Sequence, residues 1–500
     1  MLTDAPEQTK AGPMGGLVHT DPPDPLGSID QGPATGNTPG RRSTPLRVCL
    51  NTQTPLLQFL PGEDGSRPGW EGETDLSRLE EGIDYRLSPG GVTRMVYPLA
   101  KRLLAEGVWE DVHWVSLNPS APETVHLPEG ITLHHIALDP SRLGGYGHTK
   151  EAIWKTVHGV SPLRLARDLF WTDDYGEYAY YNRATAERIR ELDRTVDFDL
   201  FYIHDFQQLA VGHMLGTLKP KLFRWHIPFE ARRIPAHWRS LISTYLNSYD
   251  IVIVSVERYR TGLKRFGHQG RVECLHPYID PADYGRPAEA EVAAVCGKRG
   301  ISPDDTVALV VARMDPAKAQ DRAIEAVARL APRFPHLRLV LAGNGSFSSA
   351  RSGLGLSKSA TWRRNLEELA LSRGVADRVV FTGHLSQREL ECLYERCAFT
   401  ILPSVREGFG LVVVESWLYG KPTLISRRAG IADLVREGEN GLLFDPDEPR
   451  GLNRAMTRIL RDRGPLRAHL SEGGTRTAQA CFLEAAVKEE ARLSTLVVEE

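Results

Sequence analysis

Cysteines are few, and their spacing fits neither a metal site nor a disulfide framework. Six cysteines are scattered over 500 residues, and no two have C-x-x-C spacing. Such usage is ordinary for a protein kept in a reducing compartment. We therefore expect free thiols, no structural zinc and a cytoplasmic location.

Long apolar runs and an excess of one charge are also lacking. No stretch approaches the roughly 20 apolar residues of a membrane span, and the first 30 residues lack the pattern of a secretory signal. Lys plus Arg number 61 and Asp plus Glu number 64, a net charge of −3. This balance argues against a dedicated nucleic-acid binder or polybasic membrane binder. We expect neither nucleic acid nor a membrane span, and leave a homodimer open.

Large apolar side chains are scarce in residues 1–45, which contain eight Pro and seven Gly. Such a segment buries too little surface to offset the entropy of ordering it. We predict a disordered tail, with a partner-binding arm as the alternative.

After residue 45, short β-branched runs alternate with longer amphipathic ones. Strands are predicted at residues 47–50, 112–117, 131–138, 200–205, 221–227, 251–256, 272–275, 307–313, 337–343, 378–383, 399–403, 422–426 and 441–444. Residues 307–312 are apolar at consecutive positions, which suits a strand buried on both faces. Repeated strand–helix alternation predicts an α/β fold with doubly wound parallel sheets.

The alternation is interrupted near residues 278–302, where Pro and Gly cluster. We predict two Rossmann-like domains facing across a cleft, 46–285 and 286–475. Residues 476–500 should form a C-terminal helix, for which packing back onto the N-terminal domain stays open. Ligands of such folds bind at the carboxyl ends of the strands.

The strongest motif spans residues 406–416. Glu407 and Glu415 are eight residues apart, and between them Gly408 and Gly410 permit positive φ angles and close backbone approach. A helix beginning there could direct free N–H groups at a phosphate or a sugar hydroxyl. The carboxylates would suit sugar recognition, but two solvated glutamates beside a core helix would give the same spacing.

A second motif follows the strand at 307–313. Arg313 and Lys318 are two cations on the loop after this strand, and both could reach a diphosphate. A solvated turn is the alternative.

A third group of polar residues ends two neighbouring strands. His204, Asp205 and Gln207 follow one strand and His226 follows the next. A histidine beside an aspartate invites a general-base role, whereas histidines satisfied within the core are the alternative.

Two weaker signals complete the set. Gly90 and Gly91 precede a predicted helix, which is a ready anion site. Trp171 belongs to an aromatic group that could stack on a sugar, although helix packing explains that group equally well.

Taken together and in this order, the motifs resemble retaining nucleotide-sugar glycosyltransferases of the GT-B fold. The C-terminal half is similar to glycosyltransferase family four, through Glu407 with Glu415 and Arg313 with Lys318. The N-terminal half is similar to trehalose-6-phosphate synthases and glycosyltransferring trehalose synthases. That similarity rests on segments 204–207 and 225–229 and on the 90–91 loop.

The resemblance implies roles in binding the donor, a nucleoside-diphosphate sugar. Arg313 and Lys318 would hold the diphosphate and neutralise the leaving group without a metal or other cofactor. Glu407 would accept from sugar hydroxyls and Glu415 from the ribose. The remaining donor-binding residues implied are Gly90, Gly91, Gly408, Phe409, Gly410 and Leu411.

The resemblance also implies an acceptor site and a stereochemical course. His226 would contact the donor sugar near its reacting carbon, and Asp205 would orient acceptor hydroxyls. His204, Gln207 and Trp171 are the further acceptor residues. Front-face attack would retain the configuration, since the leaving phosphate oxygen helps to remove the acceptor proton.

Departures from these families leave the substrates open. Glu407 stands where trehalose-6-phosphate synthases have an aspartate, and no full sugar-phosphate pocket is recognisable. The acceptor could be free glucose, a sugar phosphate or a polyol phosphate, and the donor base is not fixed. A lipid or polysaccharide acceptor is an alternative, since residues 230–241, with Arg232, Arg233, Arg239 and Trp238, could form a membrane-surface patch. A phosphorylase-like activity and a non-catalytic binding protein are the others.

Overall fold

The computed structural model describes residues 44–60, 72–88, 91–119, 121–159, 168–343, 354–462 and 464–499, with the backbone alone for 354–358. Residues 1–43 and 44–500 form separate units. The predicted tail therefore lies almost wholly outside the described residues. Every element named below belongs to the second unit.

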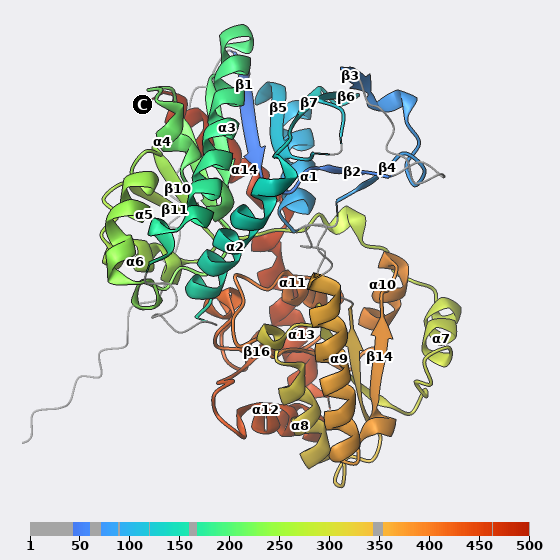
Figure 1. The fold of residues 1–500 in the computed structure, drawn as a ribbon. Helices are drawn as coiled ribbons and strands as arrows, with labels where there is room; N and C mark the ends of the chain where they lie inside the picture. Colours follow the sequence, from blue (N-terminus) through green and yellow to red (C-terminus); the bar gives the residue numbers. More distant parts are fainter. Residues whose placement is uncertain are drawn as a thin grey trace, which may run out of the picture. The chain divides into compact units, whose positions relative to one another are not determined.

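Residues up to 275 build a nine-stranded sheet with the order β11-β10-β9-β8-β1-β5-β7-β6-β3 (Figure 1). All neighbours in it are parallel except β6 and β7. Its strands are β1 (Leu46–Thr52), β3 (Glu73–Asp75), β5 (Trp109–Leu117), β6 (Thr124–Leu127), β7 (Ile131–Ile136), β8 (Leu200–His204), β9 (Lys221–Trp225), β10 (Ile251–Val254) and β11 (Arg271–Cys274). A separate antiparallel pair joins β2 (Leu57–Phe59) and β4 (Tyr85–Leu87).

The C-terminal half builds a six-stranded sheet, entirely parallel, with the order β14-β13-β12-β15-β16-β17. Its strands are β12 (Thr306–Val311), β13 (Leu337–Ala342), β14 (Val379–Gly383), β15 (Phe399–Leu402), β16 (Thr423–Ser426) and β17 (Leu442–Phe444). Strand β12 lies near the middle, so its carboxyl end meets that of β15 at one edge of the sheet.

Helices cover both faces of each sheet. They are α1 (Gly91–Ala105), α2 (Pro140–Val157), α3 (Asp173–Val196), α4 (Val211–Leu215), α5 (Arg239–Leu246), α6 (Glu257–Phe266), α7 (Glu289–Gly297), α8 (Gln320–Leu330), α9 (Leu354–Ser372), α10 (Gln387–Arg396), α11 (Leu411–Leu418), α12 (Gly451–Arg461), α13 (Pro465–Ala478) and α14 (Leu483–Glu499). Helices α2 to α6 share a core with one face of the first sheet, and α1 and α14 share a core with the other.

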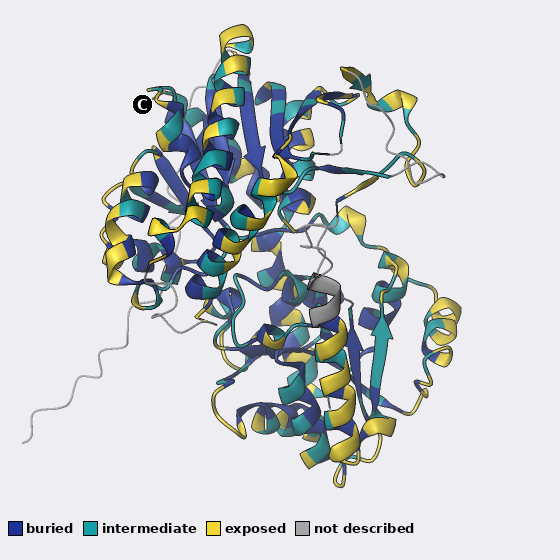
Figure 2. Cartoon of the chain, viewed as in Figure 1, coloured by how far each residue is buried: buried dark blue, intermediate teal, exposed yellow. Residues whose placement is uncertain are grey.

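Successive side chains of a strand point to opposite faces of its sheet, and both faces of each sheet are covered by helices. Consecutive residues of a strand therefore have to be apolar. On β1, Val48 and Leu50 point into the core beneath α1, whereas Cys49 points into the core beneath α2 and α3. On β12, Val307 and Val310 likewise belong to different cores. The strands of both sheets are therefore largely buried, while the outward helix faces are exposed (Figure 2).

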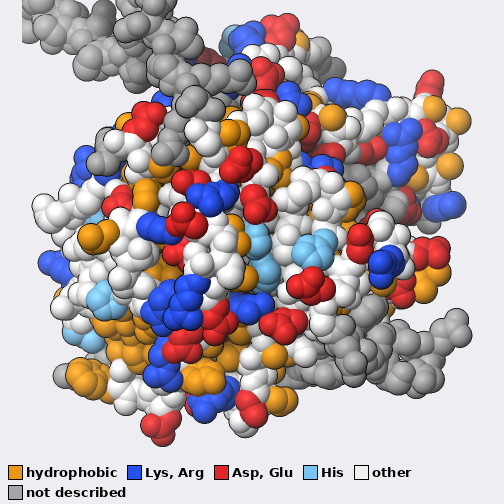
Figure 3. Space-filling view, turned by 90° about the horizontal axis from the view of Figure 1, so that it is seen from above, with side chains coloured by type: hydrophobic (Ala, Val, Ile, Leu, Met, Phe, Trp, Pro, Cys, Tyr) orange, Lys and Arg blue, Asp and Glu red, His pale blue; other side chains and the backbone are white. Residues whose placement is uncertain are grey.

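The described surface mixes both signs of charge. On the face drawn in Figure 3, basic and acidic side chains lie interspersed, in keeping with the small net charge. All six cysteines are free. Within the described ranges, no helix is long and apolar enough to cross a membrane.

The predicted fold class is confirmed. Every predicted strand coincides with a strand of one of the two large sheets. The prediction missed β2, β3, β4 and β6, which have only three or four residues each.

Helix α14 is tied to the N-terminal sheet by a buried ion pair. Arg224 Nη1 lies 2.5 Å from Glu490 Oε1, and the two side chains are 2% and 0% exposed. The hydroxyl of Tyr202 donates to the same carboxylate oxygen at 2.8 Å. Arg224 lies on β9 and Tyr202 on β8, the two strands that end in the predicted histidines.

Removing one partner of this pair should be costly, because the other charge stays buried without compensation. We expect Glu490→Gln to lower the free energy of unfolding by about 3–5 kcal/mol, measured by urea denaturation. Glu484→Gln is the matched control, since Glu484 lies on the same helix with its side chain 75% exposed. Equal stability of the two variants would contradict this account.

Candidate active site

Lys318 and Glu407 meet where two strands of the C-terminal sheet end. Lys318 lies in a short helical turn after β12, and Glu407 lies in the loop between β15 and α11. Lys318 Nζ donates to Glu407 Oε2 at 2.5 Å, and Ser404 Oγ donates to the same oxygen at 3.2 Å. Their side chains are 17% and 18% exposed, so the pair is partly shielded yet within reach of a ligand.

The charges around Glu407 keep it ionised. Burial by itself would raise the pKa of its carboxyl, but Lys318, Arg313 and the Ser404 hydrogen bond lower that pKa overall. Arg313 therefore lies close enough for its charge to act on Glu407. The structure thus brings together three of the residues predicted from the sequence, with two cations around one carboxylate.

Glycines allow backbones to approach closely around this loop. A Cβ on Gly408 would lie 2.8 Å from the carbonyl oxygen of His226, and one on Gly430 would lie 2.2 Å from the carbonyl oxygen of Gly408. Gly410, which precedes α11, has a φ of +113°. The positive φ predicted for this turn is found at Gly410, and the close approach at Gly408 is to the protein's own backbone. Approach of either glycine to a ligand stays a prediction.

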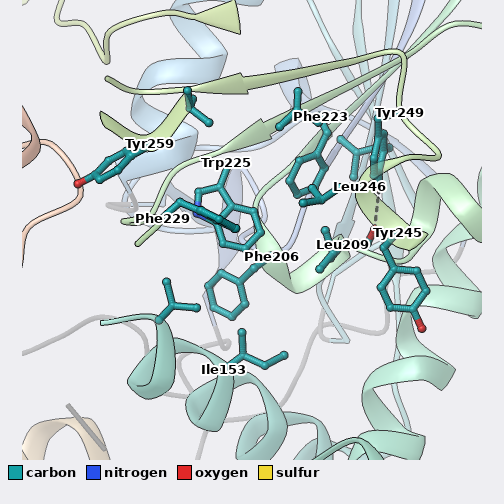
Figure 4. Packing of buried hydrophobic residues seen from close by; sticks show 14 of the residues in the cluster. Ile153, Phe206, Leu209, Phe223, Trp225, Phe229, Tyr245, Leu246, Tyr249 and Tyr259 are labelled. Carbon is teal, nitrogen blue, oxygen red and sulfur yellow. Dashed lines mark hydrogen bonds between the residues drawn. The ribbon is translucent and has the colours of Figure 1, made fainter. Parts of the chain in front are cut away.

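Side chains from α6 hold the same loop. The hydroxyl of Tyr259 donates to the carbonyl of Gly408 at 2.9 Å and to that of Glu407 at 3.3 Å. Tyr259 extends away from the neighbouring aromatic cluster toward this loop (Figure 4). Arg258 Nε lies 2.7 Å from Asp433 Oδ1, which fixes the adjoining segment of the C-terminal half.

The other residues of the 406–416 motif are placed as follows. Phe409 is buried and its ring stacks against His276 at 5.9 Å, so its side chain belongs to the core. Leu411 is the first residue of α11 and is half-buried. Glu415 accepts from the hydroxyls of Tyr394, at 2.6 Å, and Tyr284, at 3.1 Å. A ribose would have to share or replace these two bonds.

The predicted histidines lie side by side at the ends of β8 and β9. His204 Nδ1 and His226 Nε2 are 3.1 Å apart, and the rings stack at 5.4 Å. Burial is the main cause that lowers the pKa of both rings. The neighbouring His226 lowers the pKa of His204 further, and Arg224 lowers the pKa of both. Both rings are therefore neutral at pH 7.

Asp205 has an unusual backbone and an unusual proton affinity. Its φ of +71° and ψ of 166° lie in a region used almost only by glycine, at a cost of roughly 1–3 kcal/mol. Burial raises the pKa of its carboxyl to about 7. Hydrogen bonds from the backbone of Phe206 and His226 and from the side chain of Gln207 oppose this rise, but burial outweighs them. Strained backbones and pKa values shifted by burial cluster at functional sites, so Asp205 stays our candidate for an acceptor-binding residue.

Of the remaining three predicted site residues, the structure describes two. Trp171 is 88% exposed at the end of a short helical turn. Gly91 begins α1, and a Cβ there would meet no atom within 4 Å. Gly90 lies outside the described residues.

The sequence prediction missed residues that shape the site. It did not single out Ser404, Tyr259 or His158, which follows α2. Arg406 entered only as the first residue of the 406–416 motif and was given no role. Arg406 Nε donates to the carbonyl of His158 at 2.6 Å. The contacts of His158 and Tyr259 join segments far apart in the chain, so no local pattern could have indicated them. Ser404 is only three residues from Glu407, but its contact depends on the conformation of the loop.

No metal site is found among the described residues, where no three His, Cys, Asp or Glu side chains are arranged to hold an ion. Metal independence itself stays a prediction.

Comparison with known proteins agrees with this geometry. The family described as "Glycosyl transferases group 1" matches residues 296–477, and "Trehalose synthase, N-terminal domain" matches 149–261. A D-inositol 3-phosphate glycosyltransferase from Acidothermus cellulolyticus is 34% identical over 396 residues, covering 77% of this chain and 80% of the relative. One from a Nocardioides species is 31% identical over 410 residues, covering 78% and 81%. The chain belongs to the group 1 glycosyltransferases.

Solved structures show the same fold at low sequence identity. The trehalose-6-phosphate synthase OtsA has a TM-score of 0.68 at 17% identity, covering 90% of this chain and 99% of its own. Sucrose-phosphate synthase from Thermosynechococcus elongatus has a TM-score of 0.64 at 20% identity, with the same coverage. Both support the GT-B architecture predicted from the motifs.

The pKa of Asp205 predicts a measurable pH dependence. Between the ordinary value of 3.8 and the folded value of about 7, the unfolded chain loses this proton while the folded chain keeps it. As the pH rises from about 4 to about 7, Asp205 therefore makes the free energy of unfolding fall. Above pH 7 the contribution of Asp205 to this free energy no longer changes with pH. We expect Asp205→Asn to remove this fall.

The measurement is urea denaturation of both proteins at pH values from about 4 to 8. Other titrating groups are common to both, so the difference between the profiles isolates Asp205. Parallel profiles would show that Asp205 ionises normally in the folded protein.

Proposed function

We propose that this protein is a retaining hexosyltransferase. It would transfer a hexosyl group from a nucleoside-diphosphate sugar, and we propose glucose as that hexose. The acceptor would be a small sugar, a sugar phosphate or a polyol phosphate. The observation that carries the proposal is the cluster of Arg313, Lys318 and Glu407. Two cations suit a diphosphate, and the carboxylate beside them suits sugar hydroxyls.

Named relatives and neighbours support a nucleotide-sugar donor. The Anabaena protein HepE, with a TM-score of 0.59, is described in complex with UDP-glucose. An E. coli trehalose-6-phosphate protein, with a TM-score of 0.66, is described as bound with UDP-2-fluoro glucose. The relatives named D-inositol 3-phosphate glycosyltransferase make a polyol phosphate a reasonable acceptor class.

The proposed chemistry assigns each group a step. Arg313 and Lys318 stabilise the negative charge that develops on the leaving diphosphate, so no metal is required. The bond from the anomeric carbon to the phosphate oxygen breaks while the bond to the acceptor oxygen forms on the same face. The acceptor proton passes to the departing phosphate oxygen. Asp205, with a pKa of about 7, can donate to or accept from acceptor hydroxyls and so orient them.

The neutral histidine pair suits the donor side of this reaction. His226 carries no charge at pH 7, so it would not compete with Lys318 for the diphosphate. The backbone contact between His226 and Gly408 places the end of β9 against the Glu407 loop. His226 is therefore our candidate for the contact to the donor sugar.

One residue of the patch that favoured a lipid acceptor does not lie at the surface. Trp238 is fully buried in the core, and Arg233 Nε donates to Glu230 at 2.8 Å. The predicted membrane-surface patch at 230–241 is therefore wrong as far as Trp238 is concerned. Polysaccharide acceptors and a phosphorylase-like reaction stay as alternatives, and phosphate-dependent cleavage of a disaccharide would identify the latter.

Nucleoside-diphosphate release tests the proposal. We would incubate the protein with ADP-, UDP- and GDP-glucose, each alone and then with glucose, glucose 6-phosphate, fructose, glycerol 3-phosphate or inositol 3-phosphate. We expect release from one donor to depend on one acceptor. The anomeric proton coupling of the product in NMR should show the configuration of the donor.

Two outcomes would contradict parts of the proposal. An inverted product would refute retention. An absence of release with every pair would refute the small acceptors and favour a polymer or lipid acceptor.

A further inference from the structure

His158 is a buried residue next to the candidate active site. It is the residue after α2 and is about 5% exposed. Its Nδ1 lies 2.8 Å from the carbonyl oxygen of Trp154, and the two rings stack at 4.0 Å. Because a carbonyl only accepts, Nδ1 must carry the ring proton. Nε2 is then left with a lone pair that can accept a hydrogen bond.

The backbone at His158 is fastened to the residue that precedes Glu407. Arg406 Nε donates to the His158 carbonyl at 2.6 Å. A Cβ on Gly159 would lie 2.7 Å from Arg233 Nη1, so the chain turns tightly against that side chain. Arg233 pairs with Glu230, and Glu230 Oε1 lies 3.6 Å from Arg406 Nη1. This closed set of contacts fixes where α2 ends relative to the Glu407 loop.

The ring of His158 also lies within the electrostatic reach of the donor-site cluster. Burial is the main cause that lowers its pKa, to about 4, and the charges of Lys318, Glu407 and Arg313 act on it as well. At pH 7 the ring is neutral. Because the His158 carbonyl is bonded to Arg406, the residue before Glu407, this neutral ring lies beside the loop that carries the carboxylate.

We propose that His158 binds the sugar moiety of the donor, through a hydrogen bond from a sugar hydroxyl to its Nε2. This inference rests on the proposed function and extends it to a residue of the N-terminal half. A phosphate is the wrong partner for this atom, because phosphate oxygens and an unprotonated Nε2 both only accept. Among the parts of a nucleoside-diphosphate sugar held by Arg313 and Lys318, the neighbouring hydroxyls are the available donors.

A purely structural role is the competing explanation, since a side chain bonded to the carbonyl four residues earlier also caps a helix. The two roles depend on different ring nitrogens. Asparagine can donate to the Trp154 carbonyl from the position of Nδ1 but has no atom at the position of Nε2. Glutamine can reach the position of Nε2 with an acceptor oxygen. His158→Asn and His158→Gln therefore separate the roles.

The experiment measures equilibrium binding by calorimetry, using UDP-, ADP- and GDP-glucose and the matching free nucleoside diphosphates. We expect His158→Asn to keep the wild-type melting temperature and its affinity for the free diphosphate. Its affinity for the diphosphate-glucose should fall about 3- to 10-fold, the effect of one neutral hydrogen bond. His158→Gln should bind the sugar nucleotide more tightly than His158→Asn. His148→Asn, on the same helix with a side chain 73% exposed, is the matched control.

Each outcome decides the matter. Wild-type affinity of His158→Asn for the sugar nucleotide would overturn the inference. An equal loss of affinity for the sugar nucleotide and for the free diphosphate would also overturn it, since the loss would then be structural. A wild-type protein that binds none of the six ligands would instead contradict the proposed function.

Discussion

The position of the Glu407 carboxylate is the constraint on which the site depends, and both halves of the chain set it. Lys318 holds the side chain at 2.5 Å. Tyr259, from α6 of the N-terminal half, holds the backbone through the carbonyls of Glu407 and Gly408. The amide of Gly430 donates to the Glu407 carbonyl at 3.2 Å from the other side. With its backbone fixed on two sides, the loop can direct one carboxylate at a ligand without reorganising.

The need for close approach explains why small residues recur here. Backbone of the Glu407 loop lies directly against backbone at His226 and at Gly430, where any side chain would overlap a carbonyl oxygen. Gly343 serves the same purpose after β13, since a Cβ there would lie 2.2 Å from the carbonyl oxygen of Ala312. That contact supports the loop carrying Arg313. Sheet geometry brings the loops to one edge, and glycines let them meet there.

The N-terminal half contributes neutral and strained groups instead of charges. His204 and His226 are uncharged, and Arg224, whose charge acts on both rings, is matched by Glu490 of α14. The last helix of the chain thus neutralises a cation beneath the histidine pair. Asp205 holds a strained backbone and a proton near neutral pH. Such an arrangement is suited to hydroxyl-rich substrates, which need both hydrogen-bond donors and acceptors.

The two parallel sheets could be predicted from the sequence, because strands buried on both faces are apolar at consecutive positions. Residues that directly follow such strands, including Arg313, Asp205 and His226, could be placed at the correct edge for the same reason. The contributions of His158, Tyr259 and Glu490 could not be predicted. Each acts through contacts with residues more than a hundred positions away, and their local surroundings look like ordinary helix. The short strands β2, β3, β4 and β6 were missed because three or four residues carry too little periodicity.

Replacement of Glu407 by glutamine tests the central claim most directly, since the shape is kept and the charge is lost. The turnover rate with the best donor–acceptor pair should be compared with that of Glu472→Gln, whose side chain is 71% exposed. The account predicts a loss of at least about 100-fold for Glu407→Gln, in a protein that keeps its fold by circular dichroism, and wild-type rates for the control. A near-normal rate in Glu407→Gln would contradict it.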